Sequence, residues 1–434
     1  MTAKPPSIFI GNTRQRRQTR VTTGDFVHLF NESFYKISHY DAMEPFFMSL
    51  VSSSNHWMFI ASTGGLSAGR TNANHALFPY YTVDKLTENS ENTGARTILI
   101  VERSGKRYLW EPFSDRQQGI CDVERNMFKN IPGTTLIFEE INRDLKLTHR
   151  YAWRTGDTFG FVKSSWLTNY AAESCQVEVL DGLQNLLPAN VSATTQNTFS
   201  PLLDAYKKNE LDEVTGLAVY TLNSQLTDLA EPSESLLATV AWQVGLETEG
   251  ILLSSQQLDA FRSGQGVHSE TETRGQRGAY FTHAVFSLQA EEERAWHVVA
   301  DVDQDAAAVV RLTRLLRGDK KALLSSLEAD LAANTRNLEE IVTSADGMQL
   351  TDKPLVTAHH FANTMFNEMR GGYFPGQYRV NKADFLDYVS HPSDICRDNG
   401  PGRRHRLDNG NRRPFVQRRE GDNIEIGIQR VEGI

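Results

Sequence analysis

The chain has 434 residues, of which 39% are hydrophobic and 23% are charged, and its formal net charge at pH 7 is −9. This acidic balance argues against binding to nucleic acid or to an anionic membrane surface, and no run reaches the ~18 uninterrupted apolar residues of a membrane span. The cysteines Cys121, Cys175 and Cys396 form no C-x-x-C pair, which excludes a disulfide framework and a cysteine-rich zinc site. The N-terminal residues lack a secretory-type apolar run, so we expect a cytoplasmic protein of two or three domains, at ~150 residues per domain.

The stretch at residues 55–86 is the most distinctive in the chain. It begins with the apolar run WMFI at residues 57–60, which is short enough for a buried strand. Glycines follow at positions 64, 65 and 69, where the backbone must turn sharply or approach another group closely. Polar and aromatic side chains come next: Arg70, Thr71, Asn72, Asn74, Phe78, Pro79, Tyr80 and Tyr81. A strand followed by a glycine turn with such side chains predicts a recognition surface.

The same glycines raise the question of a phosphate-binding loop. Residues 64–71 read G-x-x-x-x-G-R-T, one substitution from the P-loop pattern, and the segment at 296–301 ends in an aspartate suited to magnesium. Arginine does not replace the P-loop lysine, however, and Asn72 and Pro79 interrupt the helix that the motif requires. A nucleotide-binding enzyme that uses the loop from Gly64 to Gly69 is therefore an alternative hypothesis, not the leading one.

Strand signals recur from residue 25 to residue 301. Residues 97–101 and 107–110 flank a Ser-Gly pair and predict a hairpin, and residues 136–141 and 145–153 predict a second one. Alternation along the return strand of the second hairpin places five side chains on one face: Leu145, Leu147, His149, Tyr151 and Trp153. Further strands are predicted at 159–163, 176–180, 216–222, 236–244, 279–288 and 294–302, whereas residues 183–213 indicate a long loop or short helix. This pattern predicts a mainly β fold, an antiparallel β super-sandwich over residues 1–302.

The hydrophobic period becomes helical after residue 303. Apolar residues at positions 309, 312, 315 and 316 predict a helix that ends at Gly318, and those at 323–342 predict a longer one that ends near Gly347. A third helix begins near Pro354, a favourable first-turn residue, and ends at residues 371–372. We therefore predict a helical linker at 303–350 and the first helices of a truncated helical barrel at 351–393.

Residues 394–434 differ from the rest of the chain. They contain nine arginines, no lysine and seven acidic residues, with almost no periodic apolar residues. Because a core requires periodic apolar residues, we expect an irregular Arg-rich tail whose charges nearly balance. The break with the preceding sequence suggests an altered end, such as a frameshift would produce.

Four segments together resemble the N-terminal portion of large cellobiose/chitobiose phosphorylase-like proteins, which are carbohydrate-active. They are the stretch at 57–86, LDGLQN at 180–185, RGAYF at 277–281 and MRGG at 369–372. Over roughly residues 25–392, the resemblance implies a β super-sandwich of the galactose-mutarotase type that leads through linker helices into an (α/α)6 barrel. The family's general acid, an aspartate, and its phosphate-binding groups belong to that barrel. The resemblance therefore implies a chain truncated before its catalytic part.

One segment departs from the family pattern. Family members commonly carry an Asn-Ser-Arg-Glu-like run before Leu-Thr-Pro-Trp and a following aspartate. This chain has Arg70-Thr71-Asn72, and then Leu77-Phe78-Pro79-Tyr80 and Asp84. The difference concerns specificity and the kind of reaction.

Glycosidic bond cleavage requires a proton donor and, on the other face of the sugar, a second carboxylate or phosphate. Glu139 and Glu140 are adjacent on a predicted strand and therefore point to opposite faces. The glutamates at 291–293 fit a turn between two strands. We therefore predict no catalytic residue, no metal site and no cofactor in this chain.

Sugar recognition requires aromatic faces and a few fixed polar groups. The predicted substrate-binding residues are three platforms and three polar contacts: Trp57, Tyr80 and Tyr81, and Arg70, Asn72 and Asp84. A structural interpretation also fits, with Trp57 in the core, Arg70 paired with Asp84, and Asn72 capping a turn. A further alternative is that this loop docks against the missing barrel or a second subunit.

The leading hypothesis is a supporting part of a phosphorylase-like glycoside-processing protein. Its expected ligand is an oligosaccharide or glycoside, with inorganic phosphate for the full-length protein, and it is expected to pack against another domain or as a homodimer. Nucleic acid and membrane are not expected partners. The second hypothesis is a stand-alone carbohydrate-binding β-sandwich module.

Overall fold

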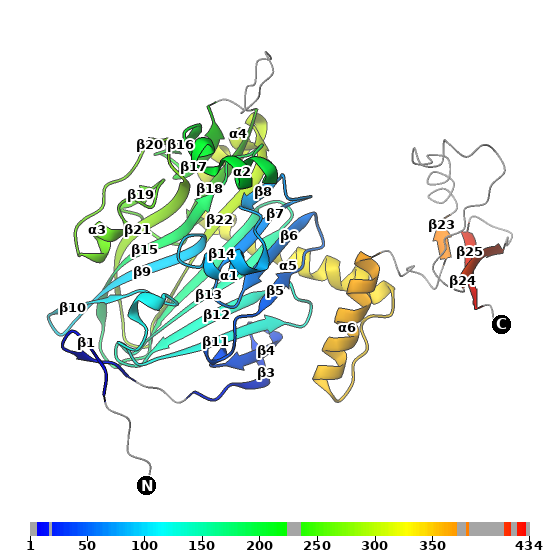
Figure 1. The fold of residues 1–434 in the computed structure, drawn as a ribbon, viewed down its shortest axis with the longest axis horizontal. Helices are drawn as coiled ribbons and strands as arrows, with labels where there is room; N and C mark the ends of the chain where they lie inside the picture. Colours follow the sequence, from blue (N-terminus) through cyan, green and yellow to red (C-terminus); the bar gives the residue numbers. More distant parts are fainter. Residues whose placement is uncertain are drawn as a thin grey trace, which may run out of the picture. The chain divides into compact units, whose positions relative to one another are not determined.

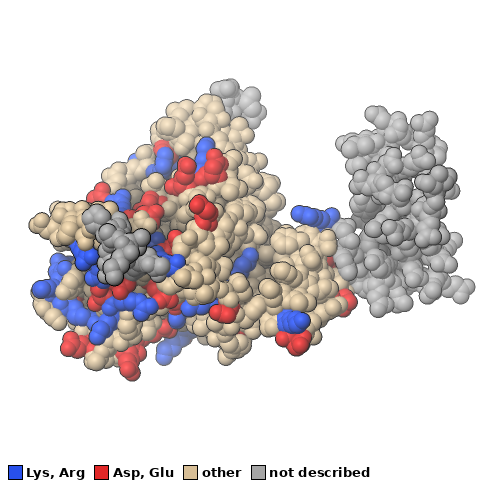
Figure 2. Space-filling model, turned by 60° about the horizontal axis from the view of Figure 1, so that its bottom comes forward, with Lys and Arg blue, Asp and Glu red and all other residues tan. Residues whose placement is uncertain are grey.

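A computed structural model describes residues 7–16, 20–223 and 236–370, together with the backbone of residues 379–381, 412–417 and 423–430. The chain forms two compact units, Met1–Thr335 and Arg336–Ile434. No helix among the described residues is long and apolar enough to cross a membrane. On the face that Figure 2 shows, Lys and Arg side chains lie among Asp and Glu side chains, without a continuous field of one sign.

Eleven antiparallel strands form the largest sheet of the first unit (Figure 1). Most neighbours in this sheet are also consecutive in the chain, as expected for hairpin connections. In spatial order the strands are β20 (Glu272–Arg274), β16 (Lys207–Asp212), β17 (Leu217–Leu222), β18 (Leu237–Val244), β22 (Glu293–Asp305), β14 (Gly160–Asn169), β13 (Leu147–Gly156), β12 (Leu136–Asn142), β11 (Val123–Asn130), β4 (Glu32–Ser38) and β3 (Thr23–Leu29).

A second antiparallel sheet has five strands. In spatial order they are β10 (Lys106–Trp110), β9 (Gly94–Arg103), β15 (Cys175–Leu186), β21 (Gly278–Leu288) and β19 (Gly250–Leu252). The short helix α3 (Leu258–Arg262) packs on this sheet through Leu258 and Phe261, which contact Leu180 and Phe281. The sheet is therefore covered on its outer side as well as on the side of the core.

The main core lies between these two sheets. One cluster joins Tyr151, Trp153 and Phe161 of the large sheet to Leu183 and Tyr280 of the five-stranded sheet. A second cluster extends the same layer toward the other end of the strands. All these side chains are buried, so the predicted antiparallel sandwich is confirmed as the architecture of the first unit.

A smaller sheet of four strands closes one side of this core. Its order follows the chain: β5 (Phe47–Leu50), β6 (His56–Ala61), β7 (Leu66–Arg70) and β8 (Ala76–Phe78). One face of it contributes Met58, Ile60, Leu66 and Ala68 to the main core. The remaining elements of the unit are the hairpin β1 (Phe9–Ile10) and β2 (Thr13–Arg14) and the short helices η1 (Tyr40–Ala42), α1 (Val83–Glu88), η2 (Asp115–Gln117) and α2 (Ala193–Asp204).

Two helices follow the last strand of the large sheet. Helix α4 (Ala306–Leu316) begins at Asp305, whose side chain accepts a hydrogen bond from the backbone N–H of Ala308, and helix α5 spans Lys320–Ser344. Leucines at every fourth position of α5 pack on the outer face of the large sheet, where they contact Trp242 and Val299: Leu323, Leu327 and Leu331. The predicted helices, including the end of the first before Gly318, are confirmed.

Polar contacts fix α5 on the sheet beside the leucine stripe. The Asp330 carboxylate accepts hydrogen bonds from the backbone N–H groups of Thr158 and Phe159 at 3.1–3.2 Å. The Asn334 side-chain oxygen accepts from the backbone N–H of Ser53 at 2.8 Å, and Glu328 forms an ion pair with Arg154 of β13. At ~100° per residue, Glu328 and Asp330 lie on either side of the stripe, so the helix is held against rotation.

The second unit contains the C-terminal part of α5 and helix α6 (Pro354–Met369). Val342, Phe361 and Met365 are buried, and α6 has proline in its first turn as predicted. The backbone of β23 (Arg379–Asn381), β24 (Arg412–Gln417) and β25 (Asn423–Arg430) forms a three-stranded sheet. Two of these strands lie in the segment predicted as a tail, while the rest of residues 371–434 lies outside the described residues.

Several local predictions are also confirmed. Hairpins join β9 to β10 and β12 to β13, and alternation along β13 holds as expected, with Leu147, Tyr151 and Trp153 in the core between the sheets. Residues 183–213 contain the short helix α2 but also β16, a strand that was not predicted. The reason is that β16 buries Lys207 and Asn209, whose polar groups are bonded to Asp204 and Thr273, so its inward face is not apolar.

Candidate functional site

Trp57 lies on the outer face of the four-stranded sheet. Its neighbours in β6, Met58 and Ile60, are buried in the main core, so strand alternation directs Trp57 and Phe59 away from that core. One edge of the Trp57 ring packs against a small apolar cluster that includes Leu187. Trp57 is therefore half-buried, and not part of the central core as the structural interpretation supposed.

The Trp57 ring is held by Gly69 and by the turn after β7. It lies across Gly69 of β7, where a Cβ atom would be only 2.6 Å from Cζ2 of the indole. The indole Nε1–H donates to the carbonyl oxygens of Arg70 at 3.3 Å and Asn72 at 3.2 Å. Gly69 thus supplies the space for the ring, and the turn after β7 supplies its hydrogen-bond acceptors.

Four aromatic rings form a continuous row across this sheet, which we call the aromatic row: Phe47, Phe59, Trp57 and Tyr80. Successive ring centroids are 5.4 Å apart for Phe47 and Phe59, 5.9 Å for Phe59 and Trp57, and 5.5 Å for Trp57 and Tyr80. The two outer members are the most accessible, since Phe47 is 42% exposed and Tyr80 is 43% exposed. Phe47, Phe59 and Trp57 are tilted by 31° and 34° from one ring to the next, whereas Tyr80 meets Trp57 edge-to-face at 77°, so the row offers an apolar surface with rings in more than one orientation.

Arg70 supports the row from behind. Its guanidinium forms two hydrogen bonds with the carboxylate of Asp301 in β22, at 2.7 and 2.9 Å, and it also donates to Asn55 Oδ1 and to the carbonyl oxygen of Asp157. The suggested pairing of Arg70 with Asp84 is therefore wrong. Burial raises the pKa of Asp301, and the hydrogen bond and charge of Arg70 oppose that shift. The geometry makes Arg70 a support of the turn.

The turn between β7 and β8 is held at both ends. The His75 Nδ1 atom lies 2.8 Å from a carboxylate oxygen of Asp303, just beyond the Arg70–Asp301 pair along β22. Within the turn, Asn72 Oδ1 accepts a hydrogen bond from the backbone N–H of Asn74 at 2.9 Å. The interpretation of Asn72 as a turn cap is confirmed; the residue is exposed, and its backbone carbonyl accepts from Trp57 Nε1.

The other two predicted residues lie after β8. Tyr81 is half-buried, and its backbone N–H donates to Ser67 Oγ at 3.1 Å. Asp84 is exposed in the first turn of α1, where a hydrogen bond with Thr82 lowers the pKa of its carboxyl group. No contact places Tyr81 or Asp84 in the aromatic row, whereas Phe47 and Phe59 belong to it and were not predicted. Alternation within WMFI would have identified Phe59, but Phe47 comes from a separate strand.

The phosphate-binding alternative does not fit the structure. Gly64 and Gly65 form the hairpin turn between β6 and β7, and Gly69 lies inside β7. After Arg70 the chain turns into β8, not into a helix. The aspartate that resembled a magnesium ligand, Asp301, is bound by Arg70. The strand–loop–helix context that a P-loop requires is therefore absent from this segment.

The predicted separation of the two adjacent glutamates is confirmed. Glu139 binds Asn126 and Arg150, whereas Glu140 binds Trp110 and Arg125 on the other face of β12. Glu291 lies in the turn between β21 and β22, as expected for the Glu291–Glu293 run. Among the described residues, no group of three His, Cys, Asp or Glu side chains is arranged to hold a metal ion.

No protein-family model and no curated protein matches this chain. Similar solved structures include one named for kojibiose phosphorylase from the human microbiome, with 10% identity over 62% of this chain and 30% of that chain and a TM-score of 0.33. A bacterial glucoamylase complexed with acarbose has 8% identity over 74% of this chain and 40% of its own, with a TM-score of 0.33. A structure named for aldose 1-epimerase from Klebsiella pneumoniae subsp. pneumoniae has 8% identity over 68% of this chain and 92% of that chain, with a TM-score of 0.35.

These similarities are distant. The chain spans 30% of the phosphorylase and 40% of the glucoamylase, and none of the TM-scores exceeds 0.35. They concern β-sandwich architecture and assign neither a ligand nor a reaction. The expected relationship to phosphorylase-like proteins thus holds only as a distant structural similarity to β-sandwich domains of carbohydrate-active proteins.

Proposed function

We propose that the first unit binds carbohydrate along the aromatic row, as a supporting, non-catalytic part of a glycoside-processing protein. The observation that carries this proposal is the row itself, in which a fixed indole is flanked by rings that are more than 40% exposed at either end. The C–H face of a sugar ring packs on an aromatic face, and neighbouring polar groups bind its hydroxyls. The exposed residue Asn72, whose backbone carbonyl accepts from Trp57 Nε1, has a side-chain amide that could supply such a polar group.

The continuity of the row favours an oligosaccharide over a single sugar. Three successive ring contacts extend from β5, across β6 and over Gly69, to Tyr80 beyond β8. A chain of sugar units can contact several rings at once, and the fixed ring positions reduce the ordering cost of binding. Arg70, Tyr81 and Asp84, which the sequence suggested as ligand contacts, are not required by this proposal.

The test is binding of hexasaccharides with β-1,4-glucose, α-1,4-glucose and β-1,4-xylose linkages, measured by isothermal titration calorimetry. At least one should bind, and Trp57→Ala should weaken it at least about tenfold, because removal of a Trp anchor typically costs about 2 kcal/mol. Tyr80→Ala should weaken binding to a smaller extent. Tyr108→Ala is the matched control, since Tyr108 is a similarly exposed aromatic on β10 of the five-stranded sheet.

Binding that survives Trp57→Ala would contradict the proposal, as would failure of all three glycans to bind. The main competing use of the row is docking of a second copy or another domain. Light scattering during size-exclusion chromatography distinguishes the two: a wild-type dimer that Trp57→Ala converts to monomer, without glycan binding, would assign the row to subunit packing instead.

A further inference from the structure

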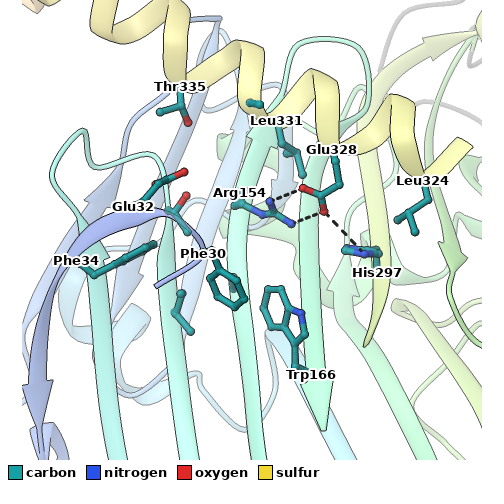
Figure 3. Close-up of a pocket in the computed structure, with 14 residues that line it drawn as sticks. Phe30, Glu32, Phe34, Arg154, Trp166, His297, Leu324, Glu328, Leu331 and Thr335 are labelled. Carbon is teal, nitrogen blue, oxygen red and sulfur yellow. Dashed lines mark hydrogen bonds and ion pairs between the residues drawn. The ribbon is translucent and has the colours of Figure 1, made fainter. Parts of the chain in front are cut away.

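A separate pocket lies between helix α5 and the outer face of the large sheet (Figure 3). Its volume is about 380 Å³, near the lower end of the range for small-molecule sites. Phe30 and Trp166 stack on each other along one side, with ring centroids 5.2 Å apart, and Leu324 and Leu331 of α5 form the opposite side. Between these two apolar sides lie Arg154, His297 and Glu328.

The polar groups of the pocket are joined by a set of hydrogen bonds. Both guanidinium Nη atoms of Arg154 lie 2.9 Å from the carboxylate of Glu328 (Figure 3). Arg154 also donates to Ser164 Oγ at 2.7 Å, and Ser164 Oγ lies 2.9 Å from Nδ1 of His297. Ser164 accepts from Arg154, and we assign its own hydrogen to the bond with His297 Nδ1, which leaves the imidazole hydrogen on Nε2.

His297 is a neutral hydrogen-bond donor at physiological pH. Burial, together with the nearby charge of Arg154, lowers the pKa of its imidazole to about 4. Its Nε2 atom is 4.0 Å from a carboxylate oxygen of Glu328, which is too far for a direct hydrogen bond. A donor and an acceptor thus face each other across a gap that one oxygen atom can bridge.

The carboxylate of Glu328 lies beside this donor. Its oxygens accept from Arg154 and keep lone pairs for a further donor. A donor that needs an oxygen, beside a carboxylate that accepts hydrogen, matches a hydroxyl group, which both donates and accepts.

The charges of the pocket disfavour charged ligands. The carboxylates of Glu32 and Glu328 and the guanidinium of Arg154 line it, and Glu328 already pairs with Arg154, so an anion would meet net repulsion. An ammonium group would satisfy a carboxylate but offers no lone pair to His297 Nε2. A neutral hydroxylated ligand can satisfy both His297 and Glu328.

We propose that this pocket binds a single small polyhydroxylated ligand, the size of one pyranose ring, with one hydroxyl bridging His297 Nε2 and Glu328. The apolar face of the ring packs against the wall formed by Phe30 and Trp166. This inference deepens the proposed function, on which it rests only in the choice of sugars as probes. It adds a pocket for one sugar unit, which is separate from the row for a chain.

The experiment is isothermal titration calorimetry of the full chain with glucose, galactose, mannose, N-acetylglucosamine and myo-inositol, and with choline chloride and sodium phosphate as charged probes. At least one neutral probe should bind, and His297→Ala and Glu328→Gln should each weaken it at least tenfold. Trp57→Ala should leave this binding unchanged, whereas it should weaken hexasaccharide binding at least about tenfold if the aromatic row functions as proposed. The two proposals can therefore fail separately.

A deoxy series of the best-bound sugar tests the bridge without altering the protein. Removal of the bridging hydroxyl should cost at least tenfold in affinity, and the same deoxy sugar should bind His297→Ala no more weakly than the parent sugar does. This comparison keeps the test valid if a protein variant fails to fold. Binding of none of the neutral probes, preferential binding of choline or phosphate, or equal binding of every deoxy sugar would each overturn the proposal.

Discussion

Replacing Lys163 with methionine is expected to lower the free energy of unfolding by about 3–5 kcal/mol, because it leaves an uncompensated charge in the core. The Lys163 ammonium group lies 2.5 Å from Asp181 Oδ1, and both side chains are fully buried between the two main sheets. Thr97 and Trp296 donate to the same carboxylate. Burial lowers the pKa of Lys163, and the charge of Asp181 opposes this shift, so each charge is maintained by the other.

Urea unfolding followed by circular dichroism measures this effect. The matched control is Arg107→Met, which removes the cation from the Arg107–Glu178 ion pair. Because the Arg107 side chain is 50% exposed, the free energy of unfolding should fall by no more than about 1 kcal/mol. The double variant Lys163→Met, Asp181→Asn should recover much of the loss, since it removes the lone charge but keeps an acceptor for Trp296. Equal losses for Lys163→Met and Arg107→Met would contradict this account.

Acidification from pH 7 to pH 4.5 is expected to destabilise the first unit through histidines whose protonation in the unfolded chain begins above the range in which most carboxylates titrate. Burial lowers the pKa of three histidines: to about 3 for His56 and His149, and to about 4 for His297. In the unfolded chain these imidazoles bind protons near pH 6.5, whereas in the folded chain they remain neutral. Between those pH values the unfolded state binds more protons, so stability rises with pH and is lost as the pH falls.

His149 gives the sharpest test of this pH dependence. It lies among the rings of Trp110, Phe113, Tyr151 and Trp296, and neither of its ring nitrogens has a hydrogen-bond partner among the described residues. His149→Phe should remove about 2–3 kcal/mol of the stability lost between pH 6.5 and 4.5. At pH 7 it should be neutral or slightly stabilising, because no buried polar atom loses a partner.

Thermal unfolding midpoints across this pH range provide the measurement. The comparison variant is the same replacement at His268, which is exposed. A His149→Phe variant with the same acid sensitivity as the wild type would show that this histidine is not the source of the effect.

Local patterns in the sequence predict those parts of the fold that depend on neighbouring residues. The Ser-Gly pair between β9 and β10 has positive φ at both positions, and leucine spacing marks α5 without reference to the sheet it covers. Strand β16 was missed because its inward positions are filled by Lys207 and Asn209, whose burial depends on partners elsewhere in the chain. Hydropathy alone cannot indicate such a strand.

The candidate sites depend on contacts that sequence spacing does not reveal. Arg70 pairs with Asp301, which is 231 positions away, and not with the nearby Asp84. Phe47 joins Phe59 in the aromatic row because β5 pairs with β6, and Glu328 of α5 meets Arg154 of β13 only because the helix folds back onto the sheet. Sequence reasoning therefore singled out Trp57 and Tyr80, which lie together in the aromatic row, but could not identify their companions or the second pocket.

The fixed rotation of α5 has a consequence for how this segment can vary among related chains. Insertion or deletion of one residue between Leu331 and Asn334 would turn all later side chains by ~100° about the helix axis. The contacts of Asn334 with Ser53 and of Thr335 with Thr134 would then be lost together, although no individual residue had been exchanged. Homologues should therefore accept many exchanges on the solvent side of this helix and no change in its length before Thr335.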